Sequence, residues 1–229
     1  MAAVLLGFSR TFFLRPWFAE WAAVHGAPEP FFYFHGAVFF VWFVVLIAQV
    51  SLVAARRVDL HRWLGRLGAG LAIVMVVLGT LAALTAARRP TGFIDVPLPP
   101  LQFLAGSVVG MAVFGVFVSL AIVTRRTVQS HKRYMLLASI SLIGAAIVRW
   151  PFAFMATELP VPRLTMTDVC ADLFLVPMVV WDLASRGRVH PVTLWGGLAL
   201  IASQPLSSVL SETEAWLAFA GWAVNLVGR

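Results

Sequence analysis

The stretch HKRYMLLASISLIGAAIVRWPF, residues 131–152, decides the fold class of this chain. It begins with three polar residues, continues apolar for about four helical turns and then carries Arg149. A helix reaches roughly 27 Å from His131 to Arg149, close to the hydrocarbon thickness of a membrane. An arginine facing lipid costs roughly 2.5 kcal/mol or more at mid-bilayer, so Arg149 requires a partner, a water-filled cavity or the interface. The stretch predicts a membrane-spanning helix with a polar residue near each membrane face.

The whole chain has the composition of a membrane protein. Of its 229 residues, 61% are hydrophobic and only 12% are charged. Most apolar residues fall in blocks about 20 residues long, the length that spans a bilayer. The net charge of +7 lies in short loops between these blocks, so it indicates membrane topology and gives no support for nucleic-acid binding. We expect one transmembrane helical domain over residues 30–229, preceded by a segment over residues 1–29.

The apolar blocks predict an all-α polytopic transmembrane bundle of about seven spans, with six as the alternative. The expected spans are residues 31–55, 63–87, 101–124, 131–152, 166–185, 192–210 and 214–228. The last two are short and are expected to form a hairpin. In the first 25 residues, aromatic side chains recur every three or four positions among charged ones. This pattern is typical of an amphipathic helix that lies in the membrane interface.

The second span carries a stripe of small residues, Gly68, Ala72, Gly79 and Ala83, at helical spacing. Small side chains let neighbouring helices approach closely inside a membrane. The stripe therefore predicts the face on which this span packs against a neighbouring helix.

Basic residues predict the orientation of the spans. The loops after the first, third and fifth spans hold most of the arginines and lysines, and cytoplasmic loops are enriched in these residues. We therefore expect these loops to be cytoplasmic and the N-terminus to lie outside. With seven spans, the C-terminus would be cytoplasmic.

This orientation brings several polar residues to one outer level inside the membrane. They are His35, Arg149, Asp168 and Asp172. Ionisable groups in a bundle usually face its interior and pair with one another, so we expect Arg149 to pair with Asp172 or Asp168. The pair could fix helix register, or it could line a substrate or proton path, and Arg149 could instead reach the interface. Trp42 and Gln49 share the helix face of His35 and could line the same pocket.

A second group of polar residues, with His61, His131 and Asp182, falls near the inner level. His61 and His131 each lie where a cytoplasmic loop enters a helix. They could anchor the helices at the interface beside arginines. They could also ligate a metal or the iron of haem b between the second and fourth spans, because neutral imidazole is a common metal ligand. The identity of any metal stays open.

The sequence carries no pattern of a known catalytic or nucleotide site. It contains no H-E-x-x-H, C-x-x-C, G-x-S-x-G or Walker pattern. No nucleophile, base and orienting group can be assembled from spacing. The sequence therefore favours a non-catalytic protein and leaves an enzyme as the alternative.

Three segments carry a resemblance to a known group. They are HGAVFFVWFVVLIAQVSLVAARRVDLHRWLG (35–65), HKRYMLLASISLIGAAIVRWP (131–151) and DLASRGRVHPVTLWGG (182–197). Their motifs (H, W and Q before L-H-R-x-L-G; H-K-R-x-M with a late arginine; D-L-x-x-x-G-R-x-H-P) resemble a group of uncharacterised bacterial multi-pass membrane proteins. The resemblance implies the bacterial inner membrane. A looser similarity is to b-type haem membrane cytochromes, which implies at most one haem here.

Three functions are open at this point. The first is a bundle with a polar pocket between the first, fourth and fifth spans, used in sensing, small-solute handling or assembly. The second is an electron-transfer protein with a single haem b. The third is a structural partner for another membrane protein. The lipid bilayer is the expected surrounding, with a small ligand or a membrane protein as the further candidate partner.

Overall fold

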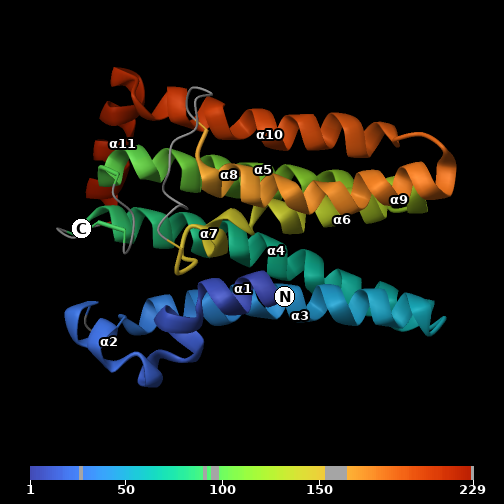
Figure 1. Cartoon of the computed structure of the whole chain (residues 1–229), viewed down its shortest axis with the longest axis horizontal. Coiled ribbons are helices and arrows are strands. Elements are labelled where there is room, and N and C mark those ends of the chain that lie inside the picture. The colour runs from blue at the N-terminus through green and yellow to red at the C-terminus, as the bar shows by residue number, and fades with distance from the viewer. Residues whose placement is uncertain (26–27, 90–91, 94–97, 153–163, 228–229) are drawn as a thin grey trace.

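The computed structural model describes residues 1–25, 28–89, 92–93, 98–152 and 164–227. In these residues the regular structure is helical, which confirms the predicted all-α bundle (Figure 1). Four helices are long and apolar enough to cross a membrane. They are α3 (Pro30–Ala54), α4 (Val58–Ala87), α5 (Pro100–Val123) and α10 (Pro191–Ser211). The expected first, second, third and sixth spans correspond to these helices.

The expected fourth and fifth spans are interrupted helices that run along the same direction as the long ones (Figure 1). The fourth consists of α6 (Val128–Ser141) and α7 (Gly144–Ile147), separated by two residues. The fifth consists of α8 (Met166–Asp172), the 3₁₀ turn η4 (Leu173–Leu175) and α9 (Val176–Arg186). Pro177 lies in the first turn of α9 and has no N–H for a helical hydrogen bond, which accounts for the tighter turn before it.

The seventh expected span is not confirmed. Helix α11 (Glu214–Leu226) has 13 residues, about 20 Å, and is too short to cross a membrane. Near its start, Trp216 donates to the Leu101 carbonyl at the beginning of α5. Just beyond its end, the Val227 carbonyl accepts from Arg88, which follows α4. Both ends of α11 therefore contact the same end of the bundle, and the helix lies across that end (Figure 1).

The N-terminal segment differs from the single amphipathic helix that we expected. It forms α1 (Ala2–Gly7), a π-helical turn η1 (Ser9–Phe13), a 3₁₀ turn η2 (Arg15–Trp17) and α2 (Ala19–His25). Helix α1 packs on α7 so closely that a Cβ at Gly7 would overlap the Ala146 carbonyl. Trp150 donates to the Ala3 carbonyl at 3.1 Å. This segment therefore packs against the interrupted fourth element.

The packing face predicted on α4 is confirmed. Gly68, Ala72, Gly79 and Ala83 are all buried, and α4 packs against both α3 and α5. A Cβ at Gly79 would overlap Met111 of α5 and come within 3.0 Å of Phe39 of α3. The absent side chain is what lets Phe39 and Met111 approach the backbone of α4.

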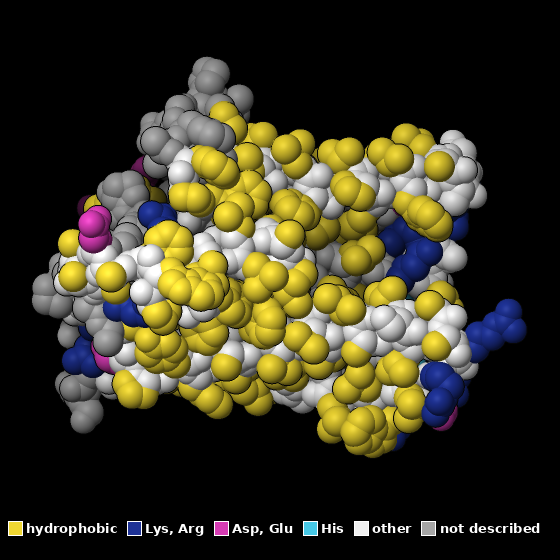
Figure 2. Space-filling model, turned by 60° about the horizontal axis from the view of Figure 1, so that its bottom comes forward, with side chains coloured by type: hydrophobic (Ala, Val, Ile, Leu, Met, Phe, Trp, Pro, Cys, Tyr) yellow, Lys and Arg dark blue, Asp and Glu magenta, His cyan; other side chains and the backbone are white. Residues whose placement is uncertain are grey.

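The outer surface of the bundle is apolar in its middle and charged toward its ends. Figure 2 shows hydrophobic side chains spread over the face in view, with lysines and arginines toward the ends. Many large apolar side chains are exposed on the long helices, such as Ile47, Ile73 and Val116. A surface of this kind is suited to lipid, because water would have to solvate it at a large cost.

The loops after α3, α5 and α9 lie together at one end of the bundle (Figure 1). We call this the basic end, since these loops and the helix ends beside them are rich in arginine and lysine. The C-terminal end of α4, the start of α8 and helix α11 lie at the opposite end (Figure 1).

Candidate functional site

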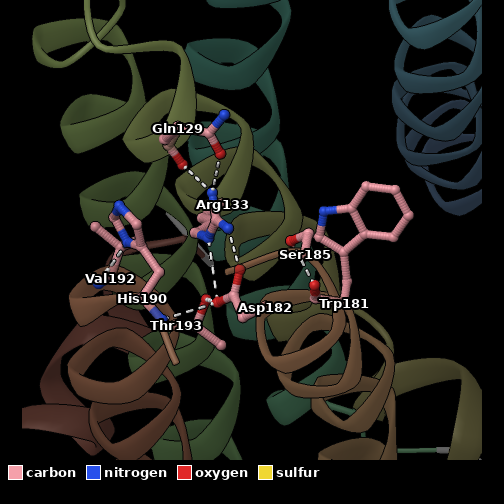
Figure 3. Close-up of polar contacts among 8 residues, drawn as sticks. All are labelled: Gln129, Arg133, Trp181, Asp182, Ser185, His190, Val192 and Thr193. Carbon is pink, nitrogen blue, oxygen red and sulfur yellow. Dashed lines mark hydrogen bonds and ion pairs between the residues drawn. The ribbon is translucent and has the colours of Figure 1, made fainter. Parts of the chain in front are cut away.

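A buried ion pair between Arg133 of α6 and Asp182 of α9 lies near the basic end (Figure 3). Arg133 Nη2 contacts Asp182 Oδ1, and Arg133 Nε donates to Oδ2 at 3.3 Å. The remaining guanidinium nitrogen, Nη1, donates to the carbonyl and side-chain oxygens of Gln129, both at 2.7 Å. The two charged side chains are almost fully buried, with exposed fractions of 3% and 1%.

The turn between α9 and α10 supplies the other donors to Asp182. Helix α9 ends at Gly187, whose φ of +67° is the left-handed conformation that glycine adopts without strain. His190 then begins α10, and its Nδ1 accepts from the Val192 N–H at 3.0 Å. This path brings the His190 N–H within 3.0 Å and the Thr193 hydroxyl within 2.6 Å of Asp182 Oδ2.

The network around Asp182 joins three helices. Arg133, Asp182 and Thr193 come from α6, α9 and α10, and the carboxylate receives donors on both oxygens. A buried ion pair of this kind is tolerated only when further hydrogen bonds complete it. We therefore assign it a structural role. The sequence predicts Asp182 at the level of His61 and His131, but it does not predict the pair with Arg133.

Burial lowers the pKa of His190 below its usual range, in the loop beside this network. The charges of Arg133, Arg186 and Lys132 lower the pKa further, whereas Asp182 raises it. The neutral imidazole is also the form that can accept from the Val192 N–H.

His61 and His131 come together at the same end. His61 is at the start of α4 and His131 at the start of α6, and their ring centroids are 6.4 Å apart with the ring planes nearly perpendicular. His131 Nδ1 lies 2.8 Å from the Ala121 carbonyl at the end of α5. A carbonyl only accepts, so Nδ1 carries a proton, and in the neutral ring Nε2 then has the free lone pair. His61 Nδ1 is buried and has no hydrogen-bond partner among the residues that the structure describes.

Gln49 of α3 also lies near this histidine pair. Its amide nitrogen is close to Gly65, one helical turn beyond His61. Its Oε1 is buried and is without a donor in the described part of the chain. Trp42, which we expected to line a pocket with Gln49, is 2% exposed and packs in the core. It donates to Ser139 at 3.2 Å and contacts Phe114 edge-on.

Two of the residues expected at the outer level, His35 and Arg149, lie near each other. The Arg149 charge lies close enough to act on the His35 ring, whose Nδ1 is buried and has no hydrogen-bond partner among the described residues. Arg149 donates to the Ala145 carbonyl at 2.6 Å, and its guanidinium lies 5.3 Å from the Phe8 ring centroid. Phe8 belongs to the N-terminal segment, which sequence reasoning did not connect with Arg149.

Asp168 and Asp172, the other two residues expected at the outer level, lie on α8. Asp168 forms a capping box with Thr165, and its Oδ2 accepts from both the backbone and the hydroxyl of that residue. Asp172 accepts from Gln204 of α10 at 2.9 Å. The direct pair between Arg149 and Asp172 stays a prediction, because the contacts described for each are to other groups.

The groove found in the region of the expected polar pocket is apolar. It is bordered by Met1, Ala2, Ala3, Leu6, Trp150 and Phe174. Helix α1 thus occupies part of the space beside the fourth and fifth elements, and a polar pocket there gains no support.

The fold and these polar groups define an α-helical bundle with helices suited to a membrane. Comparisons with protein-family models, with curated proteins and with solved structures found no match. The function is therefore inferred from the geometry of the chain itself.

Proposed function

We propose that this is a bacterial inner-membrane protein that holds a metal centre between His61 and His131 at its cytoplasmic end. The observation that carries the proposal is the 6.4 Å separation of the two ring centroids. A metal lies about 2.0–2.1 Å from a ligating imidazole nitrogen, so two rings on opposite sides of one metal have centroids roughly 6 Å apart. The metal would be haem iron or a single transition-metal ion bound through these two imidazoles, since imidazole suits iron, copper, zinc and nickel. No group of three or more His, Cys, Asp or Glu that could hold a metal occurs in the described residues, so the remaining ligands would come from the haem or from water.

The hydrogen bonds around the two rings support ligation. Metal-ligating histidines almost always donate their second N–H to a carbonyl or a carboxylate, which fixes the ring and the tautomer. The contact of His131 Nδ1 with the Ala121 carbonyl, at 2.8 Å, is of this type. The unpartnered Nδ1 of His61 leaves that ring free to offer one nitrogen to a metal. His61 and His131 would hold the metal, and Ala121 would orient the second ligand.

The cytoplasmic position follows from the arginines of the basic end. With α3, α4, α5, α6–α7, α8–α9 and α10 as crossings, the chain has six spans. An even number of crossings returns the chain to its starting side, so the start of α3 and helix α11 would both lie outside. A cytoplasmic C-terminus would require the seventh span, for which α11 is too short.

Haem iron and a single metal ion, held by the same two histidines, would give the protein different functions. Haem iron would make the protein a carrier of single electrons, as the similarity to b-type membrane cytochromes implies. A single ion would make it a metal-binding or metal-sensing protein. His61 and His131 both belong to the motifs that this chain shares with the bacterial group it resembles, L-H-R-x-L-G and H-K-R-x-M.

An absorption spectrum combined with a metal analysis tests the proposal. The protein is purified from cells grown with haem precursor and trace metals, as wild type, His61→Ala and His131→Ala. His190→Asn is the matched control, because it removes a histidine from the same end and keeps a residue that caps a helix. We expect a Soret band, or about one metal atom per chain without that band. Either signal should fall at least tenfold in both alanine variants and persist in the control.

The outcome that contradicts the proposal is a colourless protein that holds no transition metal. A metal content unchanged in His61→Ala and His131→Ala contradicts it equally.

A further inference from the structure

Asp172 and Gln204 form a polar contact in the outer half of the bundle. Gln204 Nε2 donates to Asp172 Oδ1 at 2.9 Å. Gln204 Oε1, the other end of the same amide, is buried and has no donor among the described residues. The contact therefore leaves a buried acceptor beside a carboxylate. Buried polar atoms nearly always have a partner, so Gln204 Oε1 is an acceptor that is available to a ligand.

Both helices lose regular hydrogen bonding next to this contact. The α-helix α8 ends at Asp172 and continues as the 3₁₀ turn η4. In α10, Pro205 directly follows Gln204 and offers no N–H to the Ile201 carbonyl. In membrane transporters, backbone carbonyls of interrupted helices coordinate Na⁺ at similar depth. The Ile201 carbonyl is thus a further oxygen, without its usual helical donor, on the element that carries Gln204.

The neighbouring donors are engaged elsewhere. The hydroxyls of Ser207 and Ser208 both donate to the Gln204 carbonyl, and the Ser203 hydroxyl donates to the Leu200 carbonyl. Thr165 is bound to Asp168 in the capping box. None of these described bonds supplies a proton to Gln204 Oε1. A positive ion satisfies such oxygens without any donor.

The number of charges favours a monovalent ion. No group of three or more metal-ligating side chains occurs in the described residues, which speaks against a divalent ion here. One carboxylate balances one positive charge.

The two residues lie at a similar depth in the bundle. Asp172 is six residues after the first residue of α8, and Gln204 is seven residues before the last residue of α10. Each is therefore roughly 10 Å from the helix end that lies opposite the basic end.

We propose that Asp172 and Gln204 bind a Na⁺ ion that enters from the end opposite the basic end. Asp172 supplies the charge through its carboxylate, Gln204 supplies its amide oxygen, and the Ile201 carbonyl is a candidate third ligand. This site is separate from the proposed metal centre and does not rest on it.

The test is the thermal stability of the purified protein in lipid nanodiscs, followed by tryptophan fluorescence. NaCl replaces choline chloride at constant ionic strength and constant pH. We expect the Tm of the wild type to rise by roughly 2–5 °C toward saturating Na⁺, because the ion binds only the folded state. The rise should vanish in Asp172→Asn. Asp59→Asn, at an exposed aspartate paired with Arg57, is the matched control and should keep it.

Binding of radioactive ²²Na⁺ to the wild type measures the same site without a variant, in case Asp172→Asn does not fold. Saturable binding of about one ion per chain is the expected result. A wild type with no Na⁺-specific response, or an equal response in Asp172→Asn, overturns the proposal. A response to pH alone overturns it too. His61→Ala should keep the Na⁺ response, so failure of the metal centre and failure of this site give different results.

Discussion

Asp182 and Asp172 lie on the same interrupted element, yet their surroundings are opposite. Asp182, near the basic end, is fully buried and receives donors from Arg133, Thr193 and the His190 backbone. Asp172, nearer the other end, is only partly buried and has Gln204 as its described donor. The amide of Gln204 leaves a buried oxygen without a partner in the described residues.

The difference separates a structural carboxylate from a candidate binding carboxylate. A carboxylate whose oxygens already accept hydrogen bonds from several donors has no free acceptor position for a ligand. Removing such a carboxylate lowers the stability of the protein. An incomplete one leaves an acceptor that a ligand can satisfy. The same reasoning favours His61 as a ligand, because its Nδ1 is also buried and unpartnered within the described chain. The predictions that follow test this comparison.

The largest effect is expected for the Arg133–Asp182 pair. Asp182→Asn or Arg133→Met leaves one buried charge without its partner, and each should lower the free energy of unfolding by about 3–5 kcal/mol. The double variant Arg133→Met/Asp182→Asn should lose less than the sum of the two single losses. Unfolding in mixed detergent micelles measures it. Losses below about 1 kcal/mol for the single variants, or strictly additive losses, would show that the pair is not coupled.

A smaller effect is expected for Thr193, which donates to Asp182 at 2.6 Å. Thr193→Val removes a hydrogen bond to a charged group and should cost about 1.5–3 kcal/mol. Thr80→Val is the matched control, because the Thr80 hydroxyl donates to Val76 in its own helix. The same unfolding assay compares the two. Equal losses of unfolding free energy in the two variants would mean that the hydrogen bond from Thr193 to Asp182 adds no extra stability.

Asp172→Asn should change stability by less than about 1 kcal/mol in Na⁺-free buffer. The amide oxygen of asparagine can still accept from Gln204, and the charge is no longer desolvated. Unfolding in choline chloride measures the change. A loss as large as that of Asp182→Asn would show that both aspartates are structural.

The smallest effect concerns His190, whose pKa burial and nearby cations lower. As the pH falls, His190 is protonated near pH 6.5 in the unfolded chain and only at lower pH in the folded chain. The free energy of unfolding is therefore constant with respect to this group above pH 6.5 and decreases below it. We expect a loss well under about 1 kcal/mol between pH 7.5 and 5.5 that is absent in His190→Asn. Thermal unfolding at several pH values measures it. An identical pH profile in the variant would assign the loss to another group.

The sequence predicted the long helices well, because their signal is local. Twenty apolar residues in a row identify a span, and the small-residue stripe of α4 identifies its packing face. The interruption between α6 and α7 carries no comparable signal. Helix α1 packs beside it through Gly7 and Ala146, a contact between residues far apart in the chain.

The polar contacts were harder to predict than the helices. Arg133 and Asp182 are 49 residues apart, and Arg133 follows a basic loop where an arginine usually marks topology. The sequence predicted an ion pair at Arg149 instead, because Arg149 is an isolated charge in an apolar stretch. Depth alone placed His61, His131 and Asp182 at one level, but it could not distinguish which of them were in contact.

The most direct test of the proposed metal centre is X-ray absorption spectroscopy of the metal-loaded protein in nanodiscs. The account predicts two imidazole nitrogens at about 2.0–2.1 Å from the metal. It also predicts one such nitrogen fewer, or loss of the metal, in His61→Ala and in His131→Ala. A coordination sphere without imidazole, or one that is unchanged in both variants, would contradict it.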